Sequence, residues 1–261
     1  MAHCDGDLNG AAYPPSNTIF LFTDFGAEGP YLGLMAAVLR QQAPHAEVVN
    51  LISNAPCADP RRSAYLLAAL SADLPAGGVI LAVVDPGVGG RRRPVVLHAD
   101  GRWFVGPENG LLNSVAAQAS AAEWRIIDWR PEKLSSSFHG RDLFAPIAAR
   151  IAHGDFSWPH RPVQGPDLSG WPLDLPEIIY IDHYGNAITG LRYSPRLANK
   201  ILTLGGFHIP PADTFCSVPD GALFWYGNSM GLVEIAVNRG RAGHVLGTAM
   251  VADILRFADE G

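Results

Sequence analysis

The sequence has little cysteine, no excess of positive charge and no long apolar run, and each absence excludes a class of protein. Its three cysteines, Cys4, Cys57 and Cys216, are an odd number at wide spacing. They predict neither a disulfide framework nor a zinc knuckle, and they fit the reducing conditions of the cytoplasm. No apolar run reaches the roughly 20 residues that a membrane-spanning helix needs. We therefore expect a cytoplasmic protein with no membrane partner.

Positive charge is scarce as well. The 261 residues include 19 lysines and arginines against 25 aspartates and glutamates, a formal net charge of -6. The only notable basic run is Arg91, Arg92 and Arg93, so a nucleic-acid partner is not expected. The first residues, MAHCDGDLNGAAYPPSN, lack the basic start and the apolar centre of a secretion signal. We expect residues 1–17 to form a loose N-terminal tail.

The chain does contain a regular alternation of apolar strands and helix-length segments. The run "TIFLFTDFG" (18–26) is followed by the helical spacing of "YLGLMAAVLRQQAP", and the pattern returns in "AEVVNLIS", "PRRSAYLLAALSADLP" and "GVILAVVDPGVG". Strands separated by helices are typical of βαβ units. The pattern predicts an α/β N-terminal domain over residues 18–155, with a mainly parallel sheet covered on both faces.

The composition of the sequence changes after residue 155. The segment "DFSWPHRPVQGPDLSGWPLDLPE" contains five prolines, which predicts a proline-rich linker over residues 156–176. Short strand-like runs separated by Gly, Pro and Asn follow it, such as "KILTLGGFHI", "GALFWYGNS" and "LVEIAVNRG". These runs predict a small C-terminal β-barrel domain over residues 177–261, with a sandwich as the alternative.

Three aspartates share one context. Asp24, Asp85 and Asp182 each end an apolar strand and are followed within three residues by glycine. Ligands of open α/β sheets bind beyond the carboxyl ends of the strands, so Asp24 and Asp85 are expected to meet in one crevice. The alternative is that each aspartate simply caps a turn, since this is a common role of the residue.

The remaining polar motifs are less specific. His139 and Arg141 precede an apparent helix, where a histidine can act as an acid or base, or form a capping cluster with Asp142. "DPGVGG" lacks the lysine and hydroxyl residue of a phosphate-binding loop. "GNS" around Ser229 is not a nucleophile elbow. No metal-ligand spacing occurs, so no metal site is predicted.

Taken together, six ordered motifs carry a resemblance to a known family. "TDFG" with "PYLG", "VVDPGVG", "GPENGLL", "FHGRDLFAP", "IDHYGNAIT" and "NSMGLVEIAVNRG" resemble the S-adenosylmethionine (SAM) hydroxide adenosyltransferases, the SAM hydrolases related to the fluorinase and the chlorinase. The resemblance spans residues 18 to about 250. It implies a homotrimer whose active sites lie between the N-terminal domain of one subunit and the C-terminal domain of its neighbour.

The resemblance also implies a reaction and the residues that perform it. Asp85, Arg92 and His139 match the family positions that handle the attacking water, with Arg93 as the alternative arginine if the loop is offset by one residue. The water attacks the ribose C5′ in line, and methionine leaves as a neutral thioether. SAM is the substrate, adenosine and methionine are the products, and no cofactor is implied.

Substrate-binding residues carry over from the same motifs. Asp24 matches the carboxylate that binds the ribose hydroxyls, and Asp182 and Ser229 match residues that hold the methionine amino and carboxylate groups. Asn186 and the backbone around Arg239 match adenine contacts, and Phe215 matches an aromatic residue stacked on the base. The remaining implied contacts are Tyr31 in "PYLG", Tyr184 at the usual Phe position, and Met230.

The chain also departs from the family pattern. Gly29, Ala58 and Ser53 stand where relatives commonly have Asp, an aromatic residue and His, and Glu108 replaces the Asp of "GPDNGLL". Met230 follows Ser229 where the fluorinase has Arg. Two alternatives therefore stay open beside hydrolysis. One is a SAM or adenosine sensor without turnover, and the other is a halogenase, which the carboxylate of Asp85 disfavours because it would repel a desolvated halide.

Overall fold

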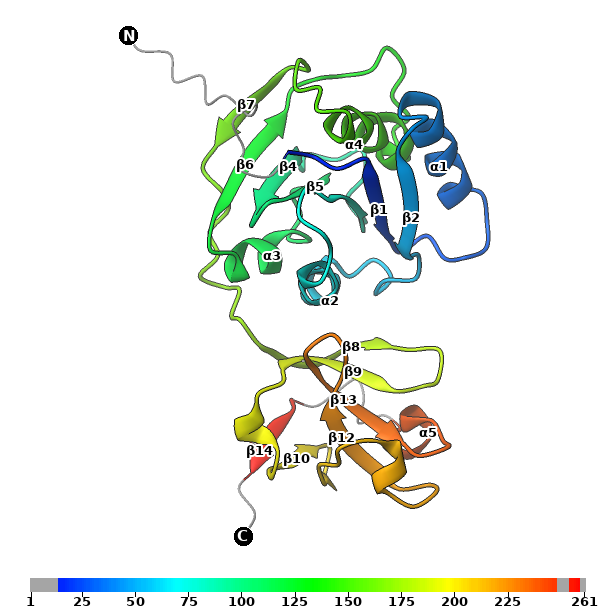
Figure 1. Cartoon of the computed structure of the whole chain (residues 1–261), viewed down its shortest axis with the longest axis vertical. Helices are drawn as coiled ribbons and strands as arrows, with labels where there is room; N and C mark the ends of the chain where they lie inside the picture. Colours follow the sequence, from blue (N-terminus) through cyan, green and yellow to red (C-terminus); the bar gives the residue numbers. More distant parts are fainter. Residues whose placement is uncertain (1–13, 248–253, 259–261) are drawn as a thin grey trace. The chain divides into compact units, whose positions relative to one another are not determined.

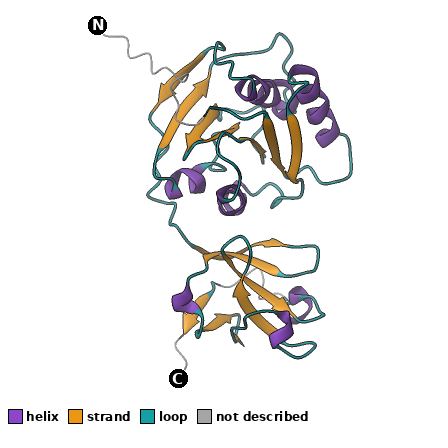
Figure 2. Cartoon of the chain, viewed as in Figure 1, coloured by secondary structure: helices purple, strands orange, loops and turns teal. Residues whose placement is uncertain are grey.

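The structure is a computed structural model that describes residues 14–247 and 254–258. The chain divides into two compact units between Trp171 and Pro172. The first unit is built on one sheet with helices on both of its faces, and the second consists mostly of strands and loops (Figures 1 and 2). Among the described residues, no helix is both long enough and apolar enough to cross a membrane.

The first unit contains a seven-stranded sheet with the order β2-β1-β3-β5-β4-β6-β7. The strands are β1 (Thr18–Thr23), β2 (Glu47–Ile52), β3 (Val79–Val83), β4 (Pro94–Ala99), β5 (Arg102–Pro107), β6 (Ala122–Ile127) and β7 (His160–Val163). All five residues of β3, "VILAV", are buried. A continuous apolar run is what a strand covered on both faces requires.

Helices cover the two faces of this sheet (Figure 1). They are α1 (Tyr31–Gln42), α2 (Pro60–Ala72), α3 (Asn113–Gln118), the π-helical turn η2 (Gly140–Phe144) and α4 (Ala145–Ala152). The α1, η2 and α4 segments pack together, and α2 packs with α3. Met35 and Leu39 of α1 join alternate residues of β3 (Val79, Leu81 and Val83) and most of α4 in one buried apolar cluster. Burial of each such side chain contributes about 1.5–3 kcal/mol.

The sheet is mixed, which corrects the prediction of a mainly parallel sheet. Strands β2, β1, β3 and β5 pair in parallel, but β4 pairs antiparallel with β5 and β6, and β6 pairs antiparallel with β7. The cause is a two-residue turn. Asp100 and Gly101, both with positive φ (44° and 77°), connect β4 directly to β5. A connection of this length and conformation forms a hairpin, and a hairpin can join only antiparallel strands.

Two predicted irregular segments contain ordered structure. Residues 1–13 of the predicted tail lie outside the described residues, but the backbone N–H of Ser16 donates to the carbonyl of Gly77 over 2.7 Å. Within the proline-rich segment 156–176, His160–Val163 form the edge strand β7. Trp171 stacks on Tyr65 of α2 with ring centroids 6.1 Å apart. Much of this segment therefore belongs to the first unit.

The second unit is rich in sheet. A four-stranded antiparallel sheet has the order β12-β13-β9-β8, and a three-stranded sheet has the order β11-β10-β14. The elements are β8 (Leu175–Ile181), β9 (Ala187–Arg192), η3 (Pro195–Leu197), β10 (Ile201–Leu204), β11 (Phe207–Ile209), η4 (Phe215–Ser217), β12 (Leu223–Gly227), β13 (Leu232–Val237), α5 (Ala242–Leu246) and β14 (Arg256–Ala258). Over residues 172–247 and 254–258 neither sheet closes on itself, so the described strands form two sheets rather than the predicted barrel.

Candidate active site

Asp85 follows the buried strand β3 and forms an ion pair with Arg92. Arg92 Nε lies 3.1 Å from Oδ1 and 2.9 Å from Oδ2 of Asp85, and Arg92 Nη2 also donates to Oδ2. The side chains of Arg92 and Asp85 are only 9% and 4% exposed. A charge pair this deeply buried is costly unless both partners are well bonded, and its fork geometry meets that condition. The pair therefore places an ordered carboxylate at the end of a core strand.

His139 completes a three-residue cluster. Its Nδ1 atom lies 2.8 Å from Arg92 Nη2, and the residue is 8% exposed. An arginine has no acceptor, so Nδ1 must accept this hydrogen bond and the ring proton must be on Nε2. Burial lowers the pKa of His139, and the charge of Arg92 lowers it further against the opposing charge of Asp85. The imidazole is therefore neutral at physiological pH, with Nε2–H available as a donor.

Glycine packing brings the two segments of this cluster together. A side chain on Gly89, which has a φ of 78°, would collide with the carbonyl oxygen of Ser136. The loop that follows Asp85 thus lies directly on the segment that leads into His139. Gly140 is less confined, because a Cβ there would come within 3.0 Å of Sδ at the end of the flexible Met35 side chain. The contact at Gly89 requires the absence of a side chain.

The two candidate arginines make different contacts. Arg93 donates through Nε and Nη2 to the two carboxylate oxygens of Glu108, and its side chain is 45% exposed. Arg92 faces Asp85 and His139 instead. Sequence alone could not choose between them, because the direction of a side chain within a loop has no periodicity to reveal it.

Asp24 follows β1 at the same edge of the sheet. The parallel register pairs Thr23 with Val83, so Asp24 and the segment of Asp85 leave the sheet side by side, as the strand-end pattern predicts. Burial raises the pKa of Asp24, the hydrogen bond from the Ala58 amide (2.9 Å) opposes this rise, and the charge of Asp85 adds to it. Asp24 is therefore a second, less deeply buried carboxylate beside the cluster.

The amide that binds Asp24 comes from a fixed segment. Ala58 has a φ of 53°, a conformation that is uncommon outside glycine. The next residue, Asp59, caps α2 by accepting the backbone N–H of Arg62 over 3.0 Å, with Pro60 at the first helical position. This start of the helix holds Ala58 in place.

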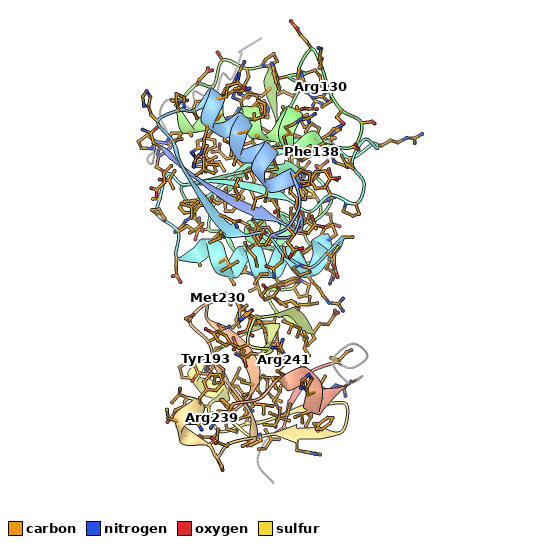
Figure 3. The ribbon with its side chains drawn as sticks, turned by 90° about the vertical axis from the view of Figure 1, so that its right-hand side faces the viewer. Arg130, Phe138, Tyr193, Met230, Arg239 and Arg241 are labelled. Carbon is orange, nitrogen blue, oxygen red and sulfur yellow. The ribbon has the colours of Figure 1, made fainter. Side chains whose placement is uncertain are left out.

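Tyr31 lies in an aromatic cluster of the first unit. Its ring centroid is 5.2 Å from that of Phe138, in an edge-to-face arrangement, and 5.9 Å from that of Phe25. Tyr31 is half exposed, while Phe138, labelled in Figure 3, is buried directly before His139. The cluster therefore offers an exposed aromatic edge next to the segment that carries the histidine.

The second unit contains a large pocket of about 910 Å³. All seven of its predicted site residues line the pocket: Asp182, Tyr184, Asn186, Phe215, Ser229, Met230 and Arg239. Figure 3 labels Met230, Arg239 and Arg241, which come from two separate segments of this lining. The chain thus brings these residues together, although they are spread over more than 50 positions in the sequence.

The strand-end aspartate of this unit, Asp182, shapes the pocket rim. Its Oδ1 accepts the backbone N–H of Asn186 over 2.8 Å, and its Oδ2 accepts the side-chain amide of Asn186 over 3.0 Å. Asp182 thus caps a turn, which was the alternative role expected for a strand-end aspartate, and it also lines the pocket. Arg239 has a φ of 54° and pairs with Asp220 over 3.2 Å.

The pocket residues that were not predicted from the sequence include Tyr226, Asn228 and Glu234. Phe215, Phe224 and Tyr226 form an aromatic wall with centroids 5.2–5.7 Å apart, and Phe215 and Tyr226 face the pocket. Glu234 and Asn228 also line it. The available signal for Glu234 was an acidic residue inside the otherwise apolar strand "LVEIAV", whose six residues are all buried.

Comparison with known proteins identifies the family. The model of the SAM hydroxide adenosyltransferase N-terminal domain matches residues 19–159, and that of the SAM hydroxide adenosyltransferase C-terminal domain matches residues 176–254. The chain belongs to the SAM hydroxide adenosyltransferase family. Family membership accounts for both units, since the two domain models together span most of the chain.

Individual known proteins and solved structures resemble this chain over most of its length. The (R)-S-adenosyl-L-methionine hydrolase of Thermus thermophilus is 40% identical to this chain, and the match covers 88% of this chain and 95% of the relative. The (R)-S-adenosyl-L-methionine hydrolase of Salinispora arenicola is 38% identical, and the match covers 86% of this chain and 91% of the relative. A crystal structure of an uncharacterized conserved protein from Thermotoga maritima superimposes with a TM-score of 0.83 at 30% identity, covering 92% of this chain and 99% of that chain. The crystal structure of a conserved hypothetical protein from Thermus thermophilus gives a TM-score of 0.73 at 37% identity, and the match covers 94% of this chain and 100% of that chain.

Proposed function

We propose that this protein hydrolyses SAM to adenosine and L-methionine. The relatives named as (R)-S-adenosyl-L-methionine hydrolases support the reaction at 36–40% identity over most of the chain. The observation within this chain that carries the proposal is the buried cluster of Asp85, Arg92 and His139, which offers a carboxylate acceptor and an imidazole donor within one hydrogen-bonded group.

The cluster suits the activation of one water molecule. Oδ1 of Asp85 accepts only one hydrogen bond from Arg92, whereas Oδ2 accepts two, so Oδ1 keeps a lone pair that can accept a hydrogen bond from water. The Nε2–H of His139 can donate to the water oxygen. Arg92 keeps both groups in these orientations. An oriented and poorly hydrated water is a much better nucleophile than one in bulk solvent.

The chemical step is an in-line displacement. The water oxygen forms a bond with the ribose C5′ while the C5′–S bond breaks, and the bonding electron pair goes to sulfur, which leaves as the neutral thioether of methionine. The water proton passes to Asp85 and then to solvent. Because the sulfonium already activates C5′, the step requires neither a covalent intermediate nor a cofactor.

We assign binding roles to the remaining residues from the family motifs that they match. Asp24 binds the ribose hydroxyls, with Tyr31 beside it. Asn186 and the backbone around Arg239 contact the adenine, while Phe215 and Tyr184 provide aromatic surface for the base. Asp182 binds the substrate ammonium, and Ser229 binds its carboxylate with Met230 beside it.

The proposed assembly is a homotrimer in the cytoplasm. One subunit supplies the water-activating groups together with Asp24 and Tyr31, and the pocket of a neighbouring subunit supplies the other substrate contacts. Such an arrangement is a heterologous interface that closes into a ring, so each trimer has three equivalent sites. Sedimentation of the intact protein at the mass of three 27.9 kDa chains is the expected result.

Isotope labelling tests the reaction directly. Turnover of SAM in water enriched in oxygen-18 should place the label in the 5′-hydroxyl of adenosine and none in methionine, because water attacks carbon rather than sulfur. Both sulfonium epimers should be supplied, since the relatives are named for the (R) form. Unlabelled adenosine would contradict attack by water on C5′.

The two alternatives have less support. A sensor would bind SAM without turnover, yet the curated relatives matched are named as hydrolases. A halogenase would need a dry site for an anion, whereas Asp85 puts a buried carboxylate there. Adding fluoride or chloride to the assay should therefore yield no halogenated adenosine.

A further inference from the structure

Glu234 is a buried acid that none of the proposed catalytic steps uses. It lies on β13 and is only 4% exposed, in a strand whose other five residues are apolar. Burying a carboxylate among apolar side chains is expensive unless its oxygens are bonded. A residue with this cost needs a compensating set of contacts, and Glu234 has one.

Both oxygens of Glu234 accept hydrogen bonds from residues that line the pocket. The hydroxyl of Tyr226, directly opposite on β12, donates to Oε1 over 2.6 Å, and the side-chain amide of Asn228 donates to Oε2 over 2.8 Å. Burial raises the pKa of Tyr226, and the bond to Glu234 and the negative charges of Glu234 and Asp182 raise it further. Tyr226 thus remains a donor over the working pH range.

Asn228 passes this constraint to the turn between β12 and β13. With its amide nitrogen directed to Glu234, its Oδ1 accepts the backbone N–H groups of Met230 and Leu232, each over 3.0 Å. The backbone of Asn228 also exchanges hydrogen bonds with Leu232 and Gly231 over 2.8 and 3.1 Å. The orientation of one amide, set by Glu234, therefore fixes the segment that carries Ser229 and Met230.

We propose that Glu234 is a positioning residue for the methionine end of the substrate: through Asn228 it fixes the turn 228–231, which presents Ser229 and Met230 to the pocket. The inference rests on the proposed function, because that proposal assigns Ser229 and Met230 to the amino-acid end of SAM. It adds a specific consequence. Loss of Glu234 should weaken binding of the amino-acid end and leave binding of the nucleoside unchanged.

Two probes separate these ends of the substrate. Adenosine lacks the amino-acid end. S-adenosyl-L-homocysteine carries it but, as a neutral thioether, is not expected to react. Calorimetric titration of the full-length protein with each probe gives two dissociation constants per variant, and their ratio reports the amino-acid end alone.

Three variants make the test specific. In Glu234→Ala the anchor of Asn228 is lost, so the dissociation constant for S-adenosyl-L-homocysteine should rise about tenfold or more, while that for adenosine stays within about twofold. Glu234→Gln is the matched rescue. Its carbonyl can accept from Asn228 and its amide can donate to the Tyr226 oxygen, so the ratio should stay within about threefold of wild type.

Asn228→Ala tests the same link from the other side. Asn228 is only partly buried, so this variant keeps the test decisive if the loss of a buried carboxylate at Glu234 prevents folding. It should reproduce the selective loss for S-adenosyl-L-homocysteine. Equal weakening of both probes, or no weakening of either, would overturn the positioning role.

Wild-type turnover of SAM, measured in parallel, distinguishes the two proposals. If the wild-type protein binds both probes but does not hydrolyse SAM, the proposed function is wrong, and the ratio of the dissociation constants still decides the role of Glu234. If it hydrolyses SAM and the variants keep the wild-type ratio, the positioning role alone is wrong. Wild-type protein that binds neither probe would overturn both.

Discussion

The Nη2 atom of Arg92 lies 2.8 Å from Nδ1 of His139, and this contact defines the protonation state of the imidazole. Because arginine can only donate, the ring must be neutral with its proton on Nε2. The same guanidinium holds Asp85, so one residue orients both the acceptor and the donor that we assign to the attacking water.

The pH profile should report His139. Burial and the charge of Arg92 lower the pKa of this histidine. The ring therefore stays neutral below its ordinary pKa of about 6.5, and protonation at lower pH breaks the contact with Arg92. We expect kcat/KM to stay flat from neutral pH to below 6.5 and to fall only at lower pH, as the ring takes up its proton. Stability should decline from about pH 6.5 downward, because the unfolded chain binds this proton before the folded protein does.

A substitution tests whether His139 causes the fall of kcat/KM at acidic pH, called the acidic limb of the profile. In His139→Asn the side-chain oxygen can still accept from Arg92, but the group no longer titrates, so the limb should disappear along with most of the activity. If the limb survived unchanged, its source would be another group. Asp24, whose pKa is raised by burial, is the first to test with Asp24→Asn.

The two neighbouring arginines should differ sharply. Arg92→Lys keeps the charge but loses the fork that binds Asp85 and His139, so the rate of hydrolysis should fall by about 100-fold or more. Arg93→Lys is the matched control, because Arg93 pairs with Glu108 and is 45% exposed, and such a pair contributes at most about 1 kcal/mol to stability. Comparable rate losses in both variants would contradict the assignment of Arg92.

Gly89 should be essential for bringing the cluster together. Gly89→Ala places a Cβ against the carbonyl of Ser136 and puts a non-glycine residue at a φ of 78°, so unfolding should become easier by about 1–3 kcal/mol. Activity should fall as well, because the loops of Asp85 and His139 are forced apart. Gly33→Ala in α1, where a Cβ meets nothing within 4 Å, should stabilise the protein by about 1 kcal/mol. Thermal denaturation and SAM turnover of both variants check this.

Much of the candidate site could be predicted from strand ends and motif order, because those features depend on local sequence. Asp24 and Asp85 emerge at one edge of the sheet since parallel neighbours end together. The mixed sheet also had a local signal, the Asp100-Gly101 turn, which the helix-strand alternation obscured. The positioning role proposed for Glu234 was not predictable in this way. It depends on hydrogen bonds from Tyr226 on the facing strand and from Asn228 in the turn that follows that strand.

Mixed subunits should reveal active sites shared between neighbouring chains. Asp85→Asn disables the water-activating half of a site, and Asp182→Ala disables the pocket half. If each site combines the two halves from different subunits, random trimers from an equal mixture should regain about a quarter of the wild-type activity. A site built within one subunit would regain none, and each variant alone should stay inactive.

The most direct test of the central claim is to incubate the purified protein with SAM in the absence of added halide and to quantify the products by chromatography. The account predicts equimolar adenosine and methionine over many turnovers, with turnover lost in Asp85→Asn. Intact SAM retained at one equivalent per chain, or equal turnover in the Asp85→Asn variant, would contradict it.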